Sequence, residues 1–238
     1  MRISGPVAPG SPGMFDQGTA RVRGKTFFCR VCDDLAGVAA ALTMLDELRT
    51  RRPRATVAVL LTRAEEDGFI GAVAAAKSGT LVRKTDRIIS VECSAMQPHA
   101  KQGDGVIIRV GDRISIFDSS FTFFMTRQAG ELAKTDKSFR FQRALMPGGA
   151  CEGTVFTAWG YTTAAACVAL GNYHNMDRQK QRIGPEYVNV DDWKNMVKLF
   201  VRLAQTIHKF EPGYAAVRGR IERRFMGLSP LLMNHARS

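Results

Sequence analysis

Carboxylate side chains are concentrated in the run 63–68, Arg-Ala-Glu-Glu-Asp-Gly, which directly follows an apolar, β-branched segment. The adjacent carboxylates of Glu65, Glu66 and Asp67 repel one another, so a place at the end of a buried strand is costly unless a cation lies beside them. A divalent metal ion would supply that charge, and metal-assisted hydrolysis is a chemistry that such sites perform. The alternative is that the three side chains form a solvated turn.

Three more groups with metal-binding chemistry come at the ends of predicted strands. Asp33 follows one apolar run, Glu92 ends the run 87–91, and His174 comes shortly after the run 163–170. In open α/β sheets, ligands bind outside the carboxyl ends of the strands, so residues far apart in sequence meet at one edge. Carboxylates with a neutral imidazole suit zinc, and also manganese or cobalt.

Each of these groups has a simpler interpretation. Asp33 or Asp34 could cap the helix that follows them. Glu92 could pair with one of the many lysines and arginines, and His174 could be a hydrogen-bonded structural histidine. Their joint occurrence at four strand ends favours a metal site over four separate coincidences.

The elements that must position these residues alternate between strands and helices. Predicted strands cover 26–31, 56–62, 87–91, 105–110, 139–144 and 163–170, and predicted helices cover 35–48, 71–78, 119–133, 154–159 and 191–210. The run 56–62 has the continuous apolar character of a strand buried on both faces. The alternation predicts an α/β fold, a three-layer α/β/α sandwich around a mixed, mostly parallel central sheet.

Two of these helices carry apolar stripes at helical spacing. In the first, the predicted buried face consists of Leu35, Val38, Ala39, Leu42, Leu45 and Leu48. In the last, Asp191 is the predicted N-cap and the buried stripe is Trp193, Met196, Val197, Phe200, Leu203 and Ile207.

Composition bounds the kind of protein. With 238 residues, 45% of them hydrophobic, the chain is long enough for one sizeable core and a small appendage. No run approaches the roughly 18 apolar residues of a membrane span, and residues 1–13 lack the apolar centre of a signal peptide. The five cysteines are an odd number, which fits a reducing compartment. We therefore expect a cytoplasmic protein without a membrane partner.

The net charge of +12 suggests a polyanionic partner, but the basic residues are scattered and no nucleic-acid motif accompanies them. Solvated basic faces are the favoured interpretation, and we expect no nucleic-acid partner. Cys29 and Cys32 have the spacing of a metal or redox pair. A single pair of this kind in a strand-like run favours structural cysteines.

The motifs and their order resemble the co-catalytic zinc exopeptidases, most closely the tetrahedral (glutamyl/deblocking) aminopeptidase branch. The resemblance covers residues 24–210. Residues 33–39, Asp-Asp-Leu-Ala-Gly-Val-Ala, resemble the helix-entry motif of those enzymes, and residues 63–72 closely resemble their Glu-Glu motif. Glu92 and the run 172–175, Asn-Tyr-His-Asn, follow in the right order, and residues 148–152 stand where that branch has a glycine-rich acidic loop.

This resemblance implies two zinc ions and release of N-terminal residues from a peptide substrate. Asp33 would bridge the two metals, Glu66 and His174 would complete one site, and Glu92 would ligate the other. Glu65 would be the general base that activates a water molecule. Relatives in this branch form large assemblies, so a homo-oligomer is also implied.

The chain departs from the family in one respect. The family takes another metal ligand from a His-x-Asp motif upstream, yet no histidine precedes Asp33; the four histidines are His99, His174, His208 and His235. The chain is therefore expected to be N-terminally truncated. We divide it into a linker or remnant of an inserted β-domain at 1–24, a catalytic domain at 25–211 and a basic tail at 212–238. The alternative function is a catalytically impaired homologue that serves as an interaction module.

Overall fold

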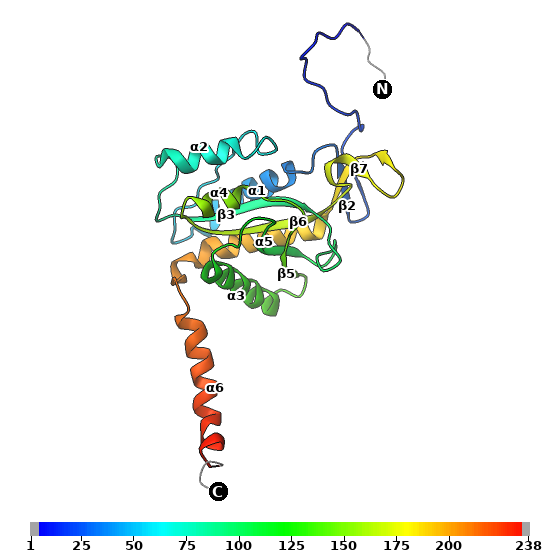
Figure 1. Cartoon of the computed structure of the whole chain (residues 1–238). Helices are drawn as coiled ribbons and strands as arrows, with labels where there is room; N and C mark the ends of the chain where they lie inside the picture. Colours follow the sequence, from blue (N-terminus) through cyan, green and yellow to red (C-terminus); the bar gives the residue numbers. More distant parts are fainter. Residues whose placement is uncertain (1–4, 235–238) are drawn as a thin grey trace.

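The computed structural model describes residues 5–234, and helices lie on both faces of one large sheet (Figure 1). The large sheet contains β1 (Arg21–Arg23), β2 (Thr26–Cys29), β3 (Arg87–Ala95), β4 (Val106–Gly111), β5 (Phe141–Leu145), β6 (Thr162–Gly171) and β9 (Glu186–Asn189). A separate hairpin consists of β7 (Met176–Asp177) and β8 (Arg182–Ile183). The α-helices are α1 (Leu35–Arg51), α2 (Ile70–Ser78), α3 (Ser119–Thr135), α4 (Glu152–Ala158), α5 (Val190–Thr206) and α6 (Ala215–Asn234), with short 3₁₀ turns at Tyr173–Asn175 and Ile207–Lys209.

The sheet is mixed, as predicted. Among the strands of residues 5–234, β3–β6 and β4–β5 pair in parallel, whereas β1–β2, β2–β9, β9–β6 and β6–β4 are antiparallel. The short strand β9 is antiparallel to both β2 and β6, so β2 and β6 run in the same direction. Because β3 is parallel to β6, the strands β2, β3 and β6 all end at one edge of the sheet.

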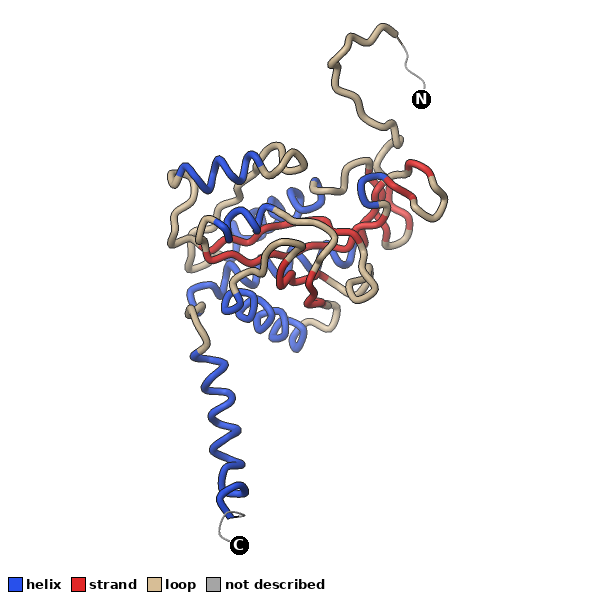
Figure 2. The backbone as a smooth tube through the Cα atoms, in the orientation of Figure 1, coloured by secondary structure: helices blue, strands red, loops and turns tan. Residues whose placement is uncertain are grey.

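Two layers of helices cover the sheet, which confirms the three-layer sandwich (Figure 2). The main core packs α1, α3 and α5 against one face, and α2 and α4 form a second cluster on the other. Side chains alternate along a strand. In β3, accordingly, Ile89 packs into the main core while Ile88 packs against the α2 and α4 cluster.

The predicted strand at 56–62 is wrong. Within residues 5–234, this segment joins no sheet. Val57 and Val59 pack against the main core, but Leu60 and Leu61 are 42% and 55% exposed. A strand buried on both faces needs packing partners on each side and a hydrogen-bonded neighbouring strand. Here one side of the segment is exposed to solvent.

The buried face of α1 also differs from the predicted one. Its buried residues are Ala36, Gly37, Ala40, Ala41, Met44 and Leu48. Leu35 and Leu42, which we expected inside, are 58% and 49% exposed. The helix is apolar on several sides, and small side chains let α5 approach closely: the indole Nε1 of Trp193 donates to the carbonyl oxygen of Ala36 at 2.9 Å.

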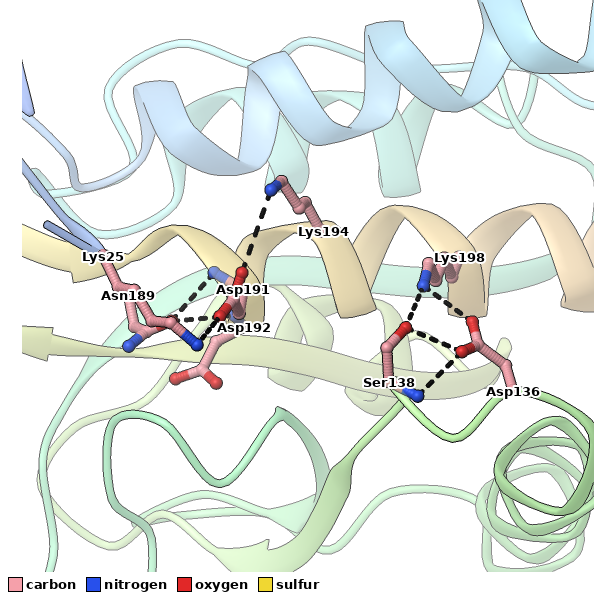
Figure 3. Close-up of polar contacts among 8 residues, drawn as sticks. All are labelled: Lys25, Asp136, Ser138, Asn189, Asp191, Asp192, Lys194 and Lys198. Atoms are coloured by element: carbon pink, nitrogen blue, oxygen red, sulfur yellow. Dashed lines mark hydrogen bonds and ion pairs between the residues drawn. The ribbon is translucent and has the colours of Figure 1, made fainter.

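In α5 the predicted stripe is confirmed, since Met196, Val197, Phe200 and Leu203 are buried. Its N-cap is Asn189 rather than Asp191, which lies in the first turn. The amide oxygen of Asn189 accepts hydrogen bonds from the backbone N–H groups of Asp191 and Asp192 (Figure 3). An Asn at this position caps as well as Asp does, so sequence pattern alone does not choose between them.

The segments outside the predicted catalytic domain are partly ordered. Residues 21–23 form β1, which pairs with β2, and most of the basic tail forms α6, which projects away from the sheet and its helices (Figure 1). Residues 1–4 and 235–238 of the predicted end segments lie outside the described residues. In the described part of the chain, no helix combines the length and apolar character needed to cross a membrane.

Candidate metal centre and active site

Three of the predicted site residues come together at the edge where β2, β3 and β6 end. Asp33 follows β2, His174 follows β6, and Glu66 lies in the turn before α2. One ligand atom from each of the three lies within 4.8 Å of the other two. Asp33 and His174 thus meet beyond the ends of β2 and β6, whereas Glu66 reaches them from a turn that, among the described residues, follows no strand.

The backbone around Asp33 is held by a carboxylate from a neighbouring strand. Glu186 on β9 is buried, and its Oε2 accepts hydrogen bonds from the N–H groups of Cys32 at 2.7 Å and Asp33 at 3.0 Å. Because β9 pairs with β2, Glu186 stands beside the point where the chain leaves β2. Glu186, on another strand, therefore fixes the backbone that carries the Asp33 side chain.

Asp34, rather than Asp33, performs the capping role. Its Oδ1 accepts a hydrogen bond from the N–H of Gly37 at 3.1 Å at the start of α1. A Cβ atom at residue 37 would overlap the Asp34 carboxylate, so this position requires glycine. The capping interpretation holds for Asp34 and leaves Asp33 free for a ligand.

The Glu-Glu run folds into a tight turn. The carbonyl oxygen of Glu65 accepts hydrogen bonds from the N–H groups of Gly68 at 3.1 Å and Phe69 at 2.8 Å. Gly68 has a φ of 98°, which favours glycine. A Cβ at Gly71 would lie 2.6 Å from the backbone nitrogen of Arg63. The spacing of the two glycines thus fixes how the carboxylates are presented.

His174 lies in a turn with unusual backbone geometry. Asn172, His174 and Asn175 have φ values of 51°, 53° and 60°, in the left-handed region that most residues avoid. The side-chain amide of Asn175 donates to the carbonyl oxygen of Arg30 at 2.8 Å, which ties the turn to the segment before Asp33. The Nε2 of His174 lies 3.6 Å from Oε2 of Glu66. Such strain is typical of functional sites.

The carboxylates at this edge are hard to ionise without a cation. Burial, together with Asp34 and Glu66, raises the pKa of Asp33 to about 8. Burial raises the pKa of Asp34 to about 7, and burial and Glu66 raise the pKa of Glu65 to about 7. A divalent cation among them would reverse these shifts, because ligands must lose their protons to bind it.

The donor set fits a divalent metal. Two carboxylates and an imidazole are ligands that zinc accepts, and ligand atoms at about 2.0–2.2 Å from one tetrahedral ion lie about 3.4 Å apart. The ligand atoms of Asp33, Glu66 and His174 lie within 4.8 Å of one another, so the three side chains would have to close around an ion to bind it.

Glu92 does not join this group. It lies inside β3, which continues to Ala95, instead of following the strand as predicted. Burial raises its pKa well above the ordinary value, and the guanidinium of Arg109 opposes that rise. Arg109 is itself buried on β4, and its Nη1 donates to Oγ of Ser94 at 3.2 Å. The charge of Arg109 thus acts on Glu92, although no ion pair joins the two among the described residues.

Two further residues at the site had no predicted role. The ring of Tyr173 stacks on the imidazole of His174 with centroids 3.9 Å apart, and burial and the Asp33 carboxylate raise the Tyr173 pKa to about 12. Glu152 begins α4 and accepts a hydrogen bond from the hydroxyl of Thr62. In the sequence, Tyr173 was marked only as part of the Asn-Tyr-His-Asn run, and Glu152 only as part of the glycine-rich acidic loop.

Comparisons with solved structures show a shared fold. The Pyrococcus horikoshii TET1 peptidase, which can assemble into a tetrahedron or a large octahedral shell, superposes with a TM-score of 0.63 at 22% identity, over 78% of this chain and 52% of that chain. A TET aminopeptidase from a marine sediment Thaumarchaeota archaeon gives a TM-score of 0.64 at 16% identity, over 81% of this chain and 54% of that one. An aminopeptidase from the archaeon Desulfurococcus kamchatkensis gives a TM-score of 0.64 at 17% identity, over 85% and 56%.

The chain therefore spans about half the length of these structural relatives. No curated protein sequence matches it. The model of the M42 glutamyl aminopeptidase family matches residues 4–199, which is most of the chain. On that match, the chain belongs to the M42 glutamyl aminopeptidase family.

Proposed function

We propose that this protein is a metal-dependent hydrolase that releases N-terminal residues from peptides. The observation that supports it most is the group of Asp33, Glu66 and His174 beside Glu65, at the edge where three strands end. Family membership supports the same reaction class.

In this proposal the residues have distinct roles toward zinc, with cobalt or manganese as alternatives. Asp33, Glu66 and His174 would hold one ion, and Asp33 together with Glu92 would hold the other. A divalent cation bound there would supply Lewis-acid polarisation and acidify water.

Glu65 is the proposed general base. Burial and Glu66 raise its pKa to about 7, so it exchanges protons readily near neutral pH. It accepts the proton of the attacking water and passes it to the amine that leaves. Tyr173 stays protonated at neutral pH, because its pKa is raised to about 12, and it donates a hydrogen bond to an acceptor in the site.

The test combines metal content with peptide hydrolysis. We expect purified protein to hold a divalent metal, to be stabilised against heat by added zinc, and to hydrolyse a free peptide but not its N-acetylated form. The proposal would be contradicted if the purified protein held no metal and if added zinc or cobalt changed neither its melting temperature nor its peptidase activity.

The alternative function, an interaction module with impaired catalysis, is favoured by one observation: in the part of the chain that the structure describes, no group of three possible ligands contains Glu92, so the second metal site is incomplete. It predicts one metal per chain and negligible turnover. The number of metals bound, measured by calorimetry, separates the two functions, since the catalytic proposal expects two.

We further propose a homo-oligomer in the cytoplasm. The assemblies formed by the Pyrococcus relative support the first part. All five cysteines are free, which supports a reducing compartment. Light scattering that gives the 26.2 kDa mass of a monomer would contradict the oligomer.

A further inference from the structure

A cavity of about 910 Å³ opens beside the candidate site, and Glu92 and Tyr173 are part of its wall. Its other walls come from the β1–β2 hairpin, the β7–β8 hairpin and the loop 146–150. Its volume is in the range of small-ligand sites, which suits a short peptide better than a long chain.

The charge of this cavity is one-sided. Its charged lining residues are Arg21, Arg23, Arg109, Arg178, Lys180 and Arg182 against Glu92 and Asp177. Of the two carboxylates, Asp177 is engaged by Arg182 at 3.6 Å and by the N–H of Lys180 at 3.1 Å. In the part of the chain that the structure describes, Arg21 and Arg23 have no ion-pair partner. The cavity thus holds unneutralised cations.

One of these cations is costly to bury and is incompletely paired. Arg109 is 3% exposed, and its Nε has no hydrogen-bond partner in the described part of the chain. A buried charge of this kind gains from an anionic partner. Glu92 is one carboxylate on which the charge of Arg109 acts, and a bound anion in the cavity would be another partner for it.

The charges around the site form a gradient. On one side lie the carboxylates of Asp33 and Glu66, grouped with His174, and that of the adjacent Glu65. On the other side lies the basic lining of the cavity. A peptide has the matching polarity, because its free amino end is cationic and its other end is a carboxylate. A field of this kind orients a charged substrate before it binds.

We infer that the cavity binds a carboxylate on the leaving-group side of the cleaved bond, so that short peptides with a free C-terminus or an acidic downstream residue are favoured. This inference rests on the proposed function, which places the amino end of the peptide among the carboxylates. Arg21 and Arg23 contact the bound carboxylate end, and both are exposed residues of β1, so their substitution leaves the core intact.

The test measures equilibrium binding to the Glu65→Gln variant, which is expected to bind peptide without consuming it. The probes are the tripeptide Leu-Gly-Gly, its C-terminal amide, and the amide Leu-Gly-Asp-NH₂. We expect the free acid to bind on the order of tenfold more tightly than Leu-Gly-Gly amide, as one charge-assisted contact gives. If Leu-Gly-Asp-NH₂ binds more tightly than Leu-Gly-Gly amide, the cavity also accepts acidic side chains. If the two amides bind equally, the cavity recognises the terminal carboxylate alone.

Two matched double variants each remove two positive charges, one pair from this cavity and one pair from a different cavity. Arg21→Gln/Arg23→Gln should abolish the preference for the free acid, whereas Arg52→Gln/Arg54→Gln, beside a different cavity, should preserve it. Equal binding of acid and amide to the parent protein, or equal effects of the two double variants, overturns the inference. Hydrolysis by the protein with native Glu65 is scored separately, so a failure of the proposed function is distinguished from a failure of this one.

Discussion

Glu65 and Glu66 are adjacent in sequence but meet different surroundings. Glu66 has a side chain 65% exposed and lies 3.6 Å from His174, whereas Glu65 is more buried and has a pKa raised to about 7. The turn that begins at Ala64 separates them, so one carboxylate lies beside the imidazole and the other is available as the proposed base. Adjacent identical side chains thus have different proposed roles because the backbone presents them differently.

At the residue scale, we expect Glu65→Gln to lower peptide turnover by about 10²–10⁴-fold, the usual contribution of a general base. Metal affinity should change little, because Glu65 is not a proposed ligand. The neighbouring exposed Asp67→Asn is the control and should retain activity. The assay is peptide hydrolysis with metal binding by calorimetry; equal losses in both variants would contradict the role of Glu65.

The pKa shifts also predict how pH affects the metal-free protein. Asp33 has a folded pKa of about 8, and Asp34 and Glu65 have folded pKa values of about 7, all above those of the unfolded chain. Protons bind the folded state more tightly, so this stabilisation is complete below about pH 4 and is lost as pH rises through 8. The melting temperature of chelated protein should therefore fall between pH 5 and pH 8.5.

Asp33→Asn should flatten this pH dependence, and Asp16→Asn, on the exposed N-terminal segment, should leave it unchanged. A melting temperature of chelated protein that rises with pH over the same range would show that the carboxylates are not buried together.

At the element scale, the N-terminus of α5 connects several parts of the fold. Besides the Asn189 cap, Asp191 pairs with Lys25 at 2.7 Å and Lys198 with Asp136 at 2.6 Å (Figure 3). The carboxylate of Asp192 is buried and accepts hydrogen bonds from Gly103 and Gly105 at 2.7 and 2.8 Å. This helix end thus anchors both β2 and the loop before β4.

Asn189→Ala should lower the free energy of unfolding by about 1 kcal/mol, because two N–H groups lose their acceptor. A change of that size shifts the melting temperature by about 2–4 °C. Lys194→Ala, on the exposed side of the same helix, is the control. Denaturant unfolding in which both variants match the parent protein would contradict the capping role.

At the scale of the whole molecule, α6 contributes little to the fold. Ile221, Phe225 and Leu228 on α6 are 63%, 58% and 50% exposed. Removal of residues 215–238 should therefore change the free energy of unfolding by less than about 0.5 kcal/mol, as expected for surface changes. Thermal and denaturant unfolding measure it, and a loss of several kcal/mol would show that α6 packs against the body.

The local hydrophobic pattern predicted secondary structure and burial well where the spacing of apolar residues within one element decides which side is buried. The stripe of α5 and the strands β3, β4 and β6 were predictable because burial on one side follows from spacing. It was uninformative where several faces are apolar, as in α1, or where a neighbour is needed, as at 56–62. The direction of each strand depends on its partners, so which strands pair in parallel and which antiparallel had no local signal.

By itself, the sequence determined the chemistry available at the site: Asp33, Glu65, Glu66, Glu92 and His174 are ligand and base types placed at or near strand ends. Only the tertiary structure decided which of them meet. Asp33 and His174 converge because β2 and β6 run the same way on either side of β9, and Glu66 reaches them from the turn before α2, whereas Glu92 stays within β3 under the charge of Arg109. Residue types are a property of the chain, but distances between them depend on how strands far apart in sequence pair.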